Sequence, residues 1–180
     1  MNELSQEEIE KIRKDPNAQI WSSISYEYKL SESFIREFRD HVKWGYISYH
    51  QTLSEDFIRE FQDKVTWHNI CTQQVLSEDF ISEFQDKVYW SAISYYHILS
   101  ENFIREFKDT VNWLGISAGQ VLSENFIREF KDELTWFFIC STQNLSKEFI
   151  IEFANQIDFE QIMFNKNISQ EIKDYCRMFL

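Results

Sequence analysis

The stretch LSEDFIREFQDKVTW, residues 53–67, decides the fold, because nearly the same letters return at a fixed interval. Residues 76–90 read LSEDFISEFQDKVYW, and residues 99–113 read LSENFIREFKDTVNW. Self-similarity at a period of about 20–50 residues is the sequence signature of a repeat architecture. Seven units each open with a Leu-Ser pair, and their first residues are Leu4, Leu30, Leu53, Leu76, Leu99, Leu122 and Leu145. A terminal half-unit covers residues 168–180.

The repeat accounts for the whole chain, so we expect a single repeat domain over residues 1–180. The first unit is three residues longer than the others, and its extra length falls at residues 15–17. A hydrophobic share of 43% and a charged share of 27% are typical of a folded globular protein. Three glycines and one proline in 180 residues disfavour a loop-rich or all-β chain.

Each unit begins with an amphipathic helix, here called helix A. Ser54 is a good N-cap, and Leu53 and Ile58 occupy the two positions of a hydrophobic staple. At 100° per residue the apolar side chains of this unit form one stripe. They are Phe57, Ile58, Phe61 and Val65. We therefore expect helix A to run for about three turns.

The second half of each unit predicts a shorter helix, here called helix B. Its fixed face carries residues at i, i+3, i+4 and i+7, namely Trp67, Ile70, Cys71 and Gln74 in one unit. All six tryptophans occupy the first of these positions, which indicates a core stacked from unit to unit. The expected N-caps are Thr66, Asn112, Thr135 and Asp158. The fold class is thus all-α, a solenoid of helix-turn-helix repeats with a terminal capping helix. A leucine-rich repeat is disfavoured because leucine occurs once per unit and the apolar spacing is helical.

The repeated string LSE-x-FI-x-EF-x-D-x-V-x-W-x-x-I-S resembles short helical tandem repeats encoded by giant DNA viruses and some large phages. The resemblance covers residues 30–164 well and both ends loosely. It implies a viral accessory protein that acts in an infected cell, inhibiting or sequestering a host factor. It implies no particular chemistry.

Four positions of helix B vary between units and fall opposite the fixed face, and we call them the helix-B surface. They include aromatic residues, which are enriched at binding hot spots. The alternatives are a tolerant solvent-exposed surface and a ribbon that binds a protein partner. The candidate contacts are Tyr46, Tyr49, His50, His68, Tyr95, Tyr96, Leu114, Phe137 and Phe138.

Helix A carries a recurring acid–Arg–acid triplet at i, i+4 and i+8, such as Glu55, Arg59 and Asp63. Such spacing predicts a solvated salt-bridge ladder, each pair contributing tenths of a kcal/mol. The alternative is an acidic ribbon that binds a basic partner, made of Glu55, Asp63, Glu101, Asp109, Glu124 and Asp132. Aspartate near a helix C-terminus is disfavoured by the dipole, yet it recurs in five successive units. We therefore expect it to accept a bond from helix-B N–H groups or from the tryptophan indole.

A formal net charge of −12 argues against direct nucleic-acid binding, which needs cations to neutralise phosphates. It permits a basic protein as partner, or an acidic mimic of nucleic acid that blocks a DNA- or RNA-binding host protein. Mimicry is weakened by the arginines interleaved among the acids. A third alternative is self-assembly, since residues 178–180, Met-Phe-Leu, could close the last helix or form a homodimer. The protein is otherwise expected to be a monomer.

The sequence lacks the patterns of an enzyme or a cofactor site. The four histidines fall at different repeat positions, and no pair has metal-ligand spacing. The recurring serines are helix caps, and no glycine-rich phosphate loop occurs. Cys71 and Cys140 share a position that is serine in other units and are expected to be small packed residues. No stretch has the length of a membrane span and the N-terminus lacks a signal-peptide core, so we expect a cytoplasmic protein without membrane contact, in the host-cell cytoplasm if viral.

Overall fold

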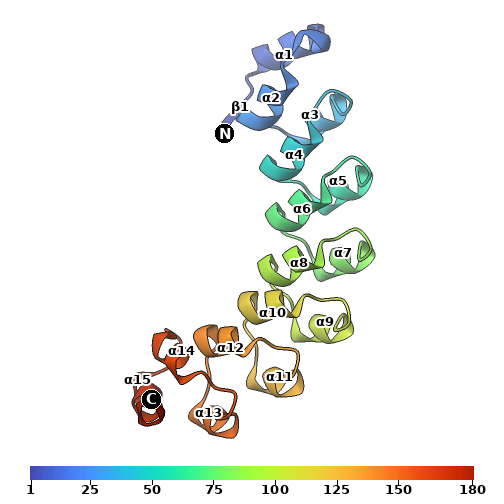
Figure 1. Cartoon of the computed structure of the whole chain (residues 1–180). Helices are drawn as coiled ribbons and strands as arrows, with labels where there is room; N and C mark the ends of the chain where they lie inside the picture. The colour runs from blue at the N-terminus through green and yellow to red at the C-terminus, as the bar shows by residue number, and fades with distance from the viewer. The chain divides into compact units, whose positions relative to one another are not determined.

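The computed structural model describes residues 1–180 and shows an all-α repeat fold, as predicted. The chain divides into two compact units, Met1–Tyr89 and Trp90–Leu180, and each is described by itself. Within each unit the helices A form one column and the helices B another (Figure 1). The expectation of a single domain stays a prediction.

The helices A begin at the Leu-Ser pairs. In the full repeats after the first they have six residues each: α3 Glu32–Glu37, α5 Glu55–Glu60, α7 Glu78–Glu83, α9 Glu101–Glu106, α11 Glu124–Glu129 and α13 Lys147–Glu152. The first, α1 Gln6–Lys14, is longer and starts with a capping box between Ser5 and Glu8. The predicted serine caps are confirmed; the Ser54 hydroxyl, for example, accepts the Phe57 N–H at 3.2 Å.

The predicted length of helix A is wrong. Helix α5 ends at Glu60, and Phe61 is its C-cap. A turn then follows, in which the Val65 N–H donates to the Phe61 carbonyl at 3.0 Å. This turn keeps Val65 in the core, at 8% exposure, without continuing the helix. The apolar period therefore extends past the helical backbone, which is why it predicted three turns.

The helices B start at the tryptophan position. They are α2 Trp21–Glu27, α4 Trp44–His50, α6 Trp67–Gln73, α8 Trp90–Tyr96, α10 Trp113–Gly119, α12 Trp136–Thr142 and α14 Phe159–Phe164. Two predicted caps are confirmed, since the side chains of Asn112 and Asp158 accept backbone N–H groups at 2.8 and 3.0 Å. Thr66 and Thr135 are the N-cap residues of α6 and α12, as predicted, but their side chains make no capping bond.

The aromatic residues form the core between successive repeats, as predicted. The Trp44 ring lies 4.9 Å from Phe61 and 6.2 Å from Phe57, both in the next repeat. Its indole N–H donates to the Arg39 carbonyl at 2.9 Å, so its polar atom is satisfied. The same triad recurs at each later tryptophan up to Trp136. A repeat therefore buries its apolar face against its neighbour, as stacked repeats require.

The fixed serine or cysteine of helix B links it to the next repeat. The Ser48 hydroxyl accepts the Thr66 N–H at 2.9 Å and donates to the Trp44 carbonyl at 2.7 Å. In the cysteine units the thiol sulfur is the acceptor, as between Tyr89 N–H and Cys71 at 3.3 Å. The position was expected to hold only a small packed residue, but it also satisfies the first N–H of the following helix B.

The fixed glutamine forms a second ladder. Gln74 is 8% exposed, and its amide nitrogen donates to the carbonyls of Ser48 and Gln51 at 3.2 and 2.8 Å. Its amide oxygen accepts the Leu53 N–H at 3.0 Å. One side chain thus holds the end of the preceding helix B and the start of the next helix A. Gln51, Gln120 and Gln143 make the corresponding bonds, each accepting the N–H of the leucine that opens its own repeat and donating to a carbonyl of the preceding one.

Both ends of the chain depart from the repeat. Near the N-terminus, β1 Asn2–Glu3 pairs in parallel with β2 Tyr28–Lys29, a strand pair that the periodicity did not predict. The extra length of the first unit forms a 3₁₀ turn, η1 Pro16–Ala18. At the other end, α15 Gln170–Cys176 is followed by the turn η2 Arg177–Phe179, and the Phe179 ring stacks on Phe159 at 5.0 Å. The terminal helix therefore covers the last aromatic position, as a cap does.

Candidate functional site

The acidic ribbon is largely engaged in holding repeats together. Glu55 is half-buried, and its carboxylate accepts the N–H of Ser77, the cap of the next helix A, at 2.6 Å. Glu101 and Glu124 make the same bond to the next capping serine, at 2.7 and 2.6 Å. These three candidate residues therefore have a structural task in the fold.

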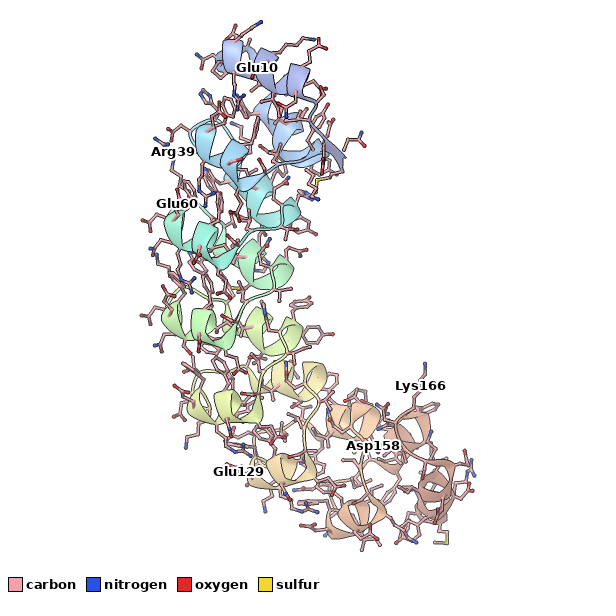
Figure 2. All side chains as sticks on the ribbon, turned by 180° about the vertical axis from the view of Figure 1, so that it is seen from behind. Glu10, Arg39, Glu60, Glu129, Asp158 and Lys166 are labelled. Atoms are coloured by element: carbon pink, nitrogen blue, oxygen red, sulfur yellow. The ribbon has the colours of Figure 1, made fainter.

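The arginines of the triplet also reach into the next repeat. The Arg59 guanidinium binds Glu83 at 2.7 Å and lies 5.0 Å above the Phe80 ring, both one repeat on. It also lies 3.6 Å from Glu55, the expected i,i+4 partner. No ion pair joins it to Asp63, so the predicted ladder is wrong for its second i,i+4 pair, Arg59 with Asp63. Figure 2 shows Arg39 and Glu60 along this helix-A side of the first unit.

The prediction for the recurring aspartate is wrong. The Asp63 side chain is 91% exposed, and its ion pair is with Lys87 of the next repeat at 3.3 Å. Asp40 pairs with Lys64 at 2.7 Å, and this bond lowers the pKa of the Asp40 carboxyl. Asp109 and Asp132 are exposed. The tryptophan indoles donate to backbone carbonyls instead. Helix A ends before the aspartate, so the aspartate does not lie in the last helical turn, where the helix dipole would disfavour it.

The helix-B surface holds most of the exposed aromatic side chains of both units. The exposed fractions of the predicted contacts run from 43% for Tyr46 to 63% for Tyr96. Tyr49, Tyr95, Leu114 and Phe137 fall between them, at 47%, 47%, 57% and 50%. His68 is exposed, whereas His50 and Phe138 are partly buried. Tyrosine and phenylalanine at such exposure supply large contact areas for a partner.

Two of the variable positions are not free to drift. Ala92 and Gly115 are buried between α8 and α10. A Cβ on Gly115 would lie 3.0 Å from the Ser94 Cβ. A Cβ on Gly119, one turn on, would lie 2.4 Å from the Tyr95 carbonyl oxygen, a distance that real side chains do not tolerate. The small residues here are required by the close approach of the two helices.

In the second unit the predicted contacts form separate pairs. Tyr95 and Tyr96 meet edge to face at 4.8 Å, and Phe137 and Phe138 do so at 5.3 Å. Leu114 stands exposed on α10, with no aromatic ring paired to it.

In the first unit the structure brings three predicted contacts together with a fourth ring. The His50 ring lies 4.8 Å from Tyr26 and 4.7 Å from Tyr49, edge to face in both cases. Tyr46 lies 5.6 Å from Tyr26 and 6.2 Å from His50. His68, on the next helix B, lies apart and meets Tyr89 at 5.3 Å. The four rings on α2 and α4 form one aromatic cluster.

This cluster borders an open groove of about 610 Å³, which we call the tyrosine groove. It is lined by Ser22, Lys43, Gly45, Tyr46, Tyr49, His50 and Asn69. Its size falls in the range of about 300–1,000 Å³ usual for binding pockets. Gly45 leaves the groove open, because a Cβ there would meet nothing closer than the Thr66 hydroxyl at 4.0 Å. Asn69 closes one edge, donating to the Gly45 carbonyl at 3.0 Å.

The charge of the tyrosine groove is opposite to that of the chain. Lys43 is its only charged lining residue, and the Lys43 ammonium is exposed and forms no ion pair. The whole chain has a formal net charge of −12. The groove therefore presents a single cation beside tyrosine and histidine rings.

Sequence reasoning missed Tyr26 and Lys43. Tyr26 stands one repeat before Tyr49, at the same position of helix B, so a comparison that included the first unit would have found it. Lys43 stands at the cap position of α4, where no other unit carries a basic residue, and its neighbours in space are not visible in the repeat pattern.

No protein-family model, curated protein or solved structure matches the chain. None of the helices combines the length and the apolar character that a membrane crossing needs. No group of three or more His, Cys, Asp and Glu side chains is arranged to hold a metal ion. The geometry of the repeats therefore has to support any functional proposal by itself.

Proposed function

We propose that the protein is a non-enzymatic helical-repeat scaffold that binds a protein partner through its helix-B surface. The observation that carries the proposal is the tyrosine groove, an open apolar hollow lined by Tyr46, Tyr49 and His50. Tyr26 packs against two of these rings, those of Tyr46 and His50. Exposed apolar patches rimmed by polar residues are typical of interaction sites. Tyrosine is among the residues that contribute most to binding.

The groove is a better candidate than the acidic ribbon because of what each surface does in the fold. Glu55, Glu101 and Glu124 already accept backbone N–H groups of neighbouring repeats. A partner that bound those carboxylates would leave the backbone N–H groups of the capping serines without an acceptor. The rings of the groove have no such task, so a partner can cover them without cost to the fold. The resemblance to viral repeats extends the proposal to a host factor as the partner, which the protein would inhibit or sequester.

A peptide-display selection tests the proposal while the partner is still unidentified. Random peptides are selected on the whole chain and then screened on the variant Gly45→Leu. The leucine side chain fills the groove, and α10 already carries leucine at the equivalent position, Leu114. Ser91→Leu is the matched control, since it places the same side chain at the same position of α8, outside the groove. Circular dichroism establishes that both variants are folded.

Enriched peptides should bind the parent chain and Ser91→Leu alike. They should lose about 30-fold or more in affinity for Gly45→Leu, the effect of removing a hot spot. Equal binding to all three chains would place the contact elsewhere. The acidic ribbon would then be examined with Asp63→Asn, Asp109→Asn and Asp132→Asn combined.

A further inference from the structure

We propose that the occupant of the tyrosine groove is a proline-rich segment in the polyproline II conformation that carries a carboxylate. The inference rests on the proposed function and names the class of partner for the same site. Three features of the groove support it: its rings, the spacing of its helices and its charge.

The rings form the kind of surface that receives proline. Tyr26, His50 and Tyr49 meet edge to face in one run, with centroids 4.8 and 4.7 Å apart. Proline-rich segments bind in aromatic-lined grooves of this kind, where the pyrrolidine rings lie between aromatic faces. Polyproline II is already formed in the free peptide, so such a segment loses little conformational entropy on binding. A shallow, open groove makes few contacts with which to fix the conformation of a ligand, so it favours a peptide that is already in its bound conformation.

The spacing of the repeat matches the spacing of the ligand. Tyr26 and Tyr49 stand at the same position of two successive helices B, α2 and α4. Packed helices are about 8–10 Å apart. Polyproline II repeats every three residues, or about 9.3 Å. A β-strand repeats its side-chain direction every 6.6–6.8 Å or so, and an α-helix turns every 5.4 Å or so, and neither matches. Of these three conformations, polyproline II has the period closest to the spacing of packed helices, and so suits tyrosines that repeat from one helix B to the next.

The charge selects a carboxylate. Lys43 is the only charged residue that lines the groove, and its ammonium has no ion pair within the chain. An acidic residue at one end of the bound segment would give it a partner. The pair would be exposed, and exposed pairs contribute up to about 1 kcal/mol, so it would set the orientation and the preference more than the affinity.

Defined peptides test the inference by fluorescence anisotropy. The first has three Pro-Pro-Leu triplets followed by glutamate, the second has lysine in place of glutamate, and the third has alanine in place of every proline. Each is titrated with the whole chain and with Gly45→Leu, Ser91→Leu and Lys43→Asp. The last substitution uses the residue that stands at this position in α14's repeat, Asp158.

The glutamate peptide should bind the parent and Ser91→Leu. Replacing its prolines by alanine should weaken binding about tenfold, through lost pre-organisation. Gly45→Leu should abolish the difference between the proline and alanine peptides. Lys43→Asp should reverse the preference between the glutamate and lysine peptides, which we expect to be about fivefold in the parent.

Several results would overturn the inference. Equal binding of the proline and alanine peptides to the parent, or no binding of either, would exclude polyproline II as the bound form. A preference for the lysine peptide in the parent would exclude the role of Lys43. If the random peptides of the display selection still depended on the groove, as helical or β-strand ligands or as a second copy of the chain would, the proposed function would stand and only this inference would fail. If they too were indifferent to Gly45→Leu, both would fail.

Discussion

The glutamine ladder gives the sharpest test of how the repeats are joined. We consider Gln74→Met, which keeps the length and nearly the volume of the side chain but removes its amide. The substitution deletes three bonds of 2.8–3.2 Å: two to carbonyls of the preceding repeat, and one from the Leu53 N–H, which starts the repeat of Gln74 itself. The site is 8% exposed, so water does not readily replace them.

The magnitude follows from those bonds. A net hydrogen bond contributes about 1 kcal/mol, and a buried donor left unpaired, here the Leu53 N–H, costs a further 1–3 kcal/mol or so. We expect Gln74→Met to lower the free energy of unfolding by about 4–6 kcal/mol, a large part of the roughly 5–15 kcal/mol of a typical domain. Gln73→Met is the matched control. Gln73 is exposed and its amide reaches only the Thr72 hydroxyl at 3.3 Å, so we expect a change within about 0.5 kcal/mol.

Urea denaturation followed by far-ultraviolet circular dichroism measures both changes, and hydrogen exchange of the Leu53 amide reports the local bond. Because repeats are coupled to their neighbours, loss of one link should also broaden or split the transition. A loss below about 1 kcal/mol, or one equal to that of Gln73→Met, would refute the reasoning. So would unchanged protection of the Leu53 amide.

Three further predictions concern packing, pH and thiol reactivity. Gly119→Ala should lower the melting temperature, because its Cβ would overlap a backbone carbonyl and cost about 1–3 kcal/mol of stability. Gly45→Ala should raise the melting temperature, because helix propensity adds about 0.5–1 kcal/mol of stability, and a change of the same sign in both variants would contradict the close-approach argument. The hydrogen bond from Arg13 lowers the pKa of Glu37 below its usual 4.5, so the stability that this pair contributes is present above pH 4.5 and is lost as the pH falls through the lowered pKa. In Arg13→Gln, NMR titration should show the Glu37 midpoint rise towards 4.5, and an unchanged midpoint would exclude the pair as the cause. Burial raises the pKa of the Cys140 thiol to about 11, so it should resist iodoacetamide at pH 7.5 or so in the folded chain and react in urea; rapid labelling without denaturant would show that the core opens.

The fold could be predicted well from the sequence because each feature of a repeat recurs in several units. A serine cap such as Ser54 recurs in every unit, and so does the aromatic residue that opens helix B, so repetition identified both and both are confirmed. The end of helix A was not predicted, because Val65 keeps the helical spacing while the backbone has already turned. Apolar periodicity reports which side chains face the core, and a turn can satisfy it as well as a helix.

The links between repeats could not be read from the period. Glu55 bonds to Ser77, and Arg59 to Glu83, each one repeat on. A pattern that recurs every unit does not say whether a residue bonds within its own unit or to the next one, and the i,i+4 rule favoured the former. The strand pair β1–β2 was missed for a different reason. It forms from Asn2–Glu3, which precedes the first Leu-Ser pair and has no counterpart in the other units.

The candidate site shows the opposite relation between repetition and function. The residues that recur, such as Gln74 and Ser48, bond to neighbouring repeats, so their polar atoms are not available to a ligand. A binding site in such an array has to be built from residues that differ between units. At the second position of helix B the full repeats carry Ser, Gly, His, Ser, Leu, Phe and Glu in turn, and Gly45 is the one without a side chain.

Besides Gly45, a pair of tyrosines distinguishes this part of the array. Tyr26 and Tyr49 are the only aromatic residues that stand at the same exposed position in two consecutive helices B. The glycine opens the hollow, Tyr49 lines it and Tyr26 packs against the lining residue His50. The tyrosine groove therefore exists at one place in the array although the backbone repeats throughout. Helix propensity disfavours glycine inside α4 by about 0.8–1.0 kcal/mol relative to alanine, and the packing leaves room for a Cβ there. No contact within the fold explains Gly45, whereas the proposed occupant of the groove would explain it.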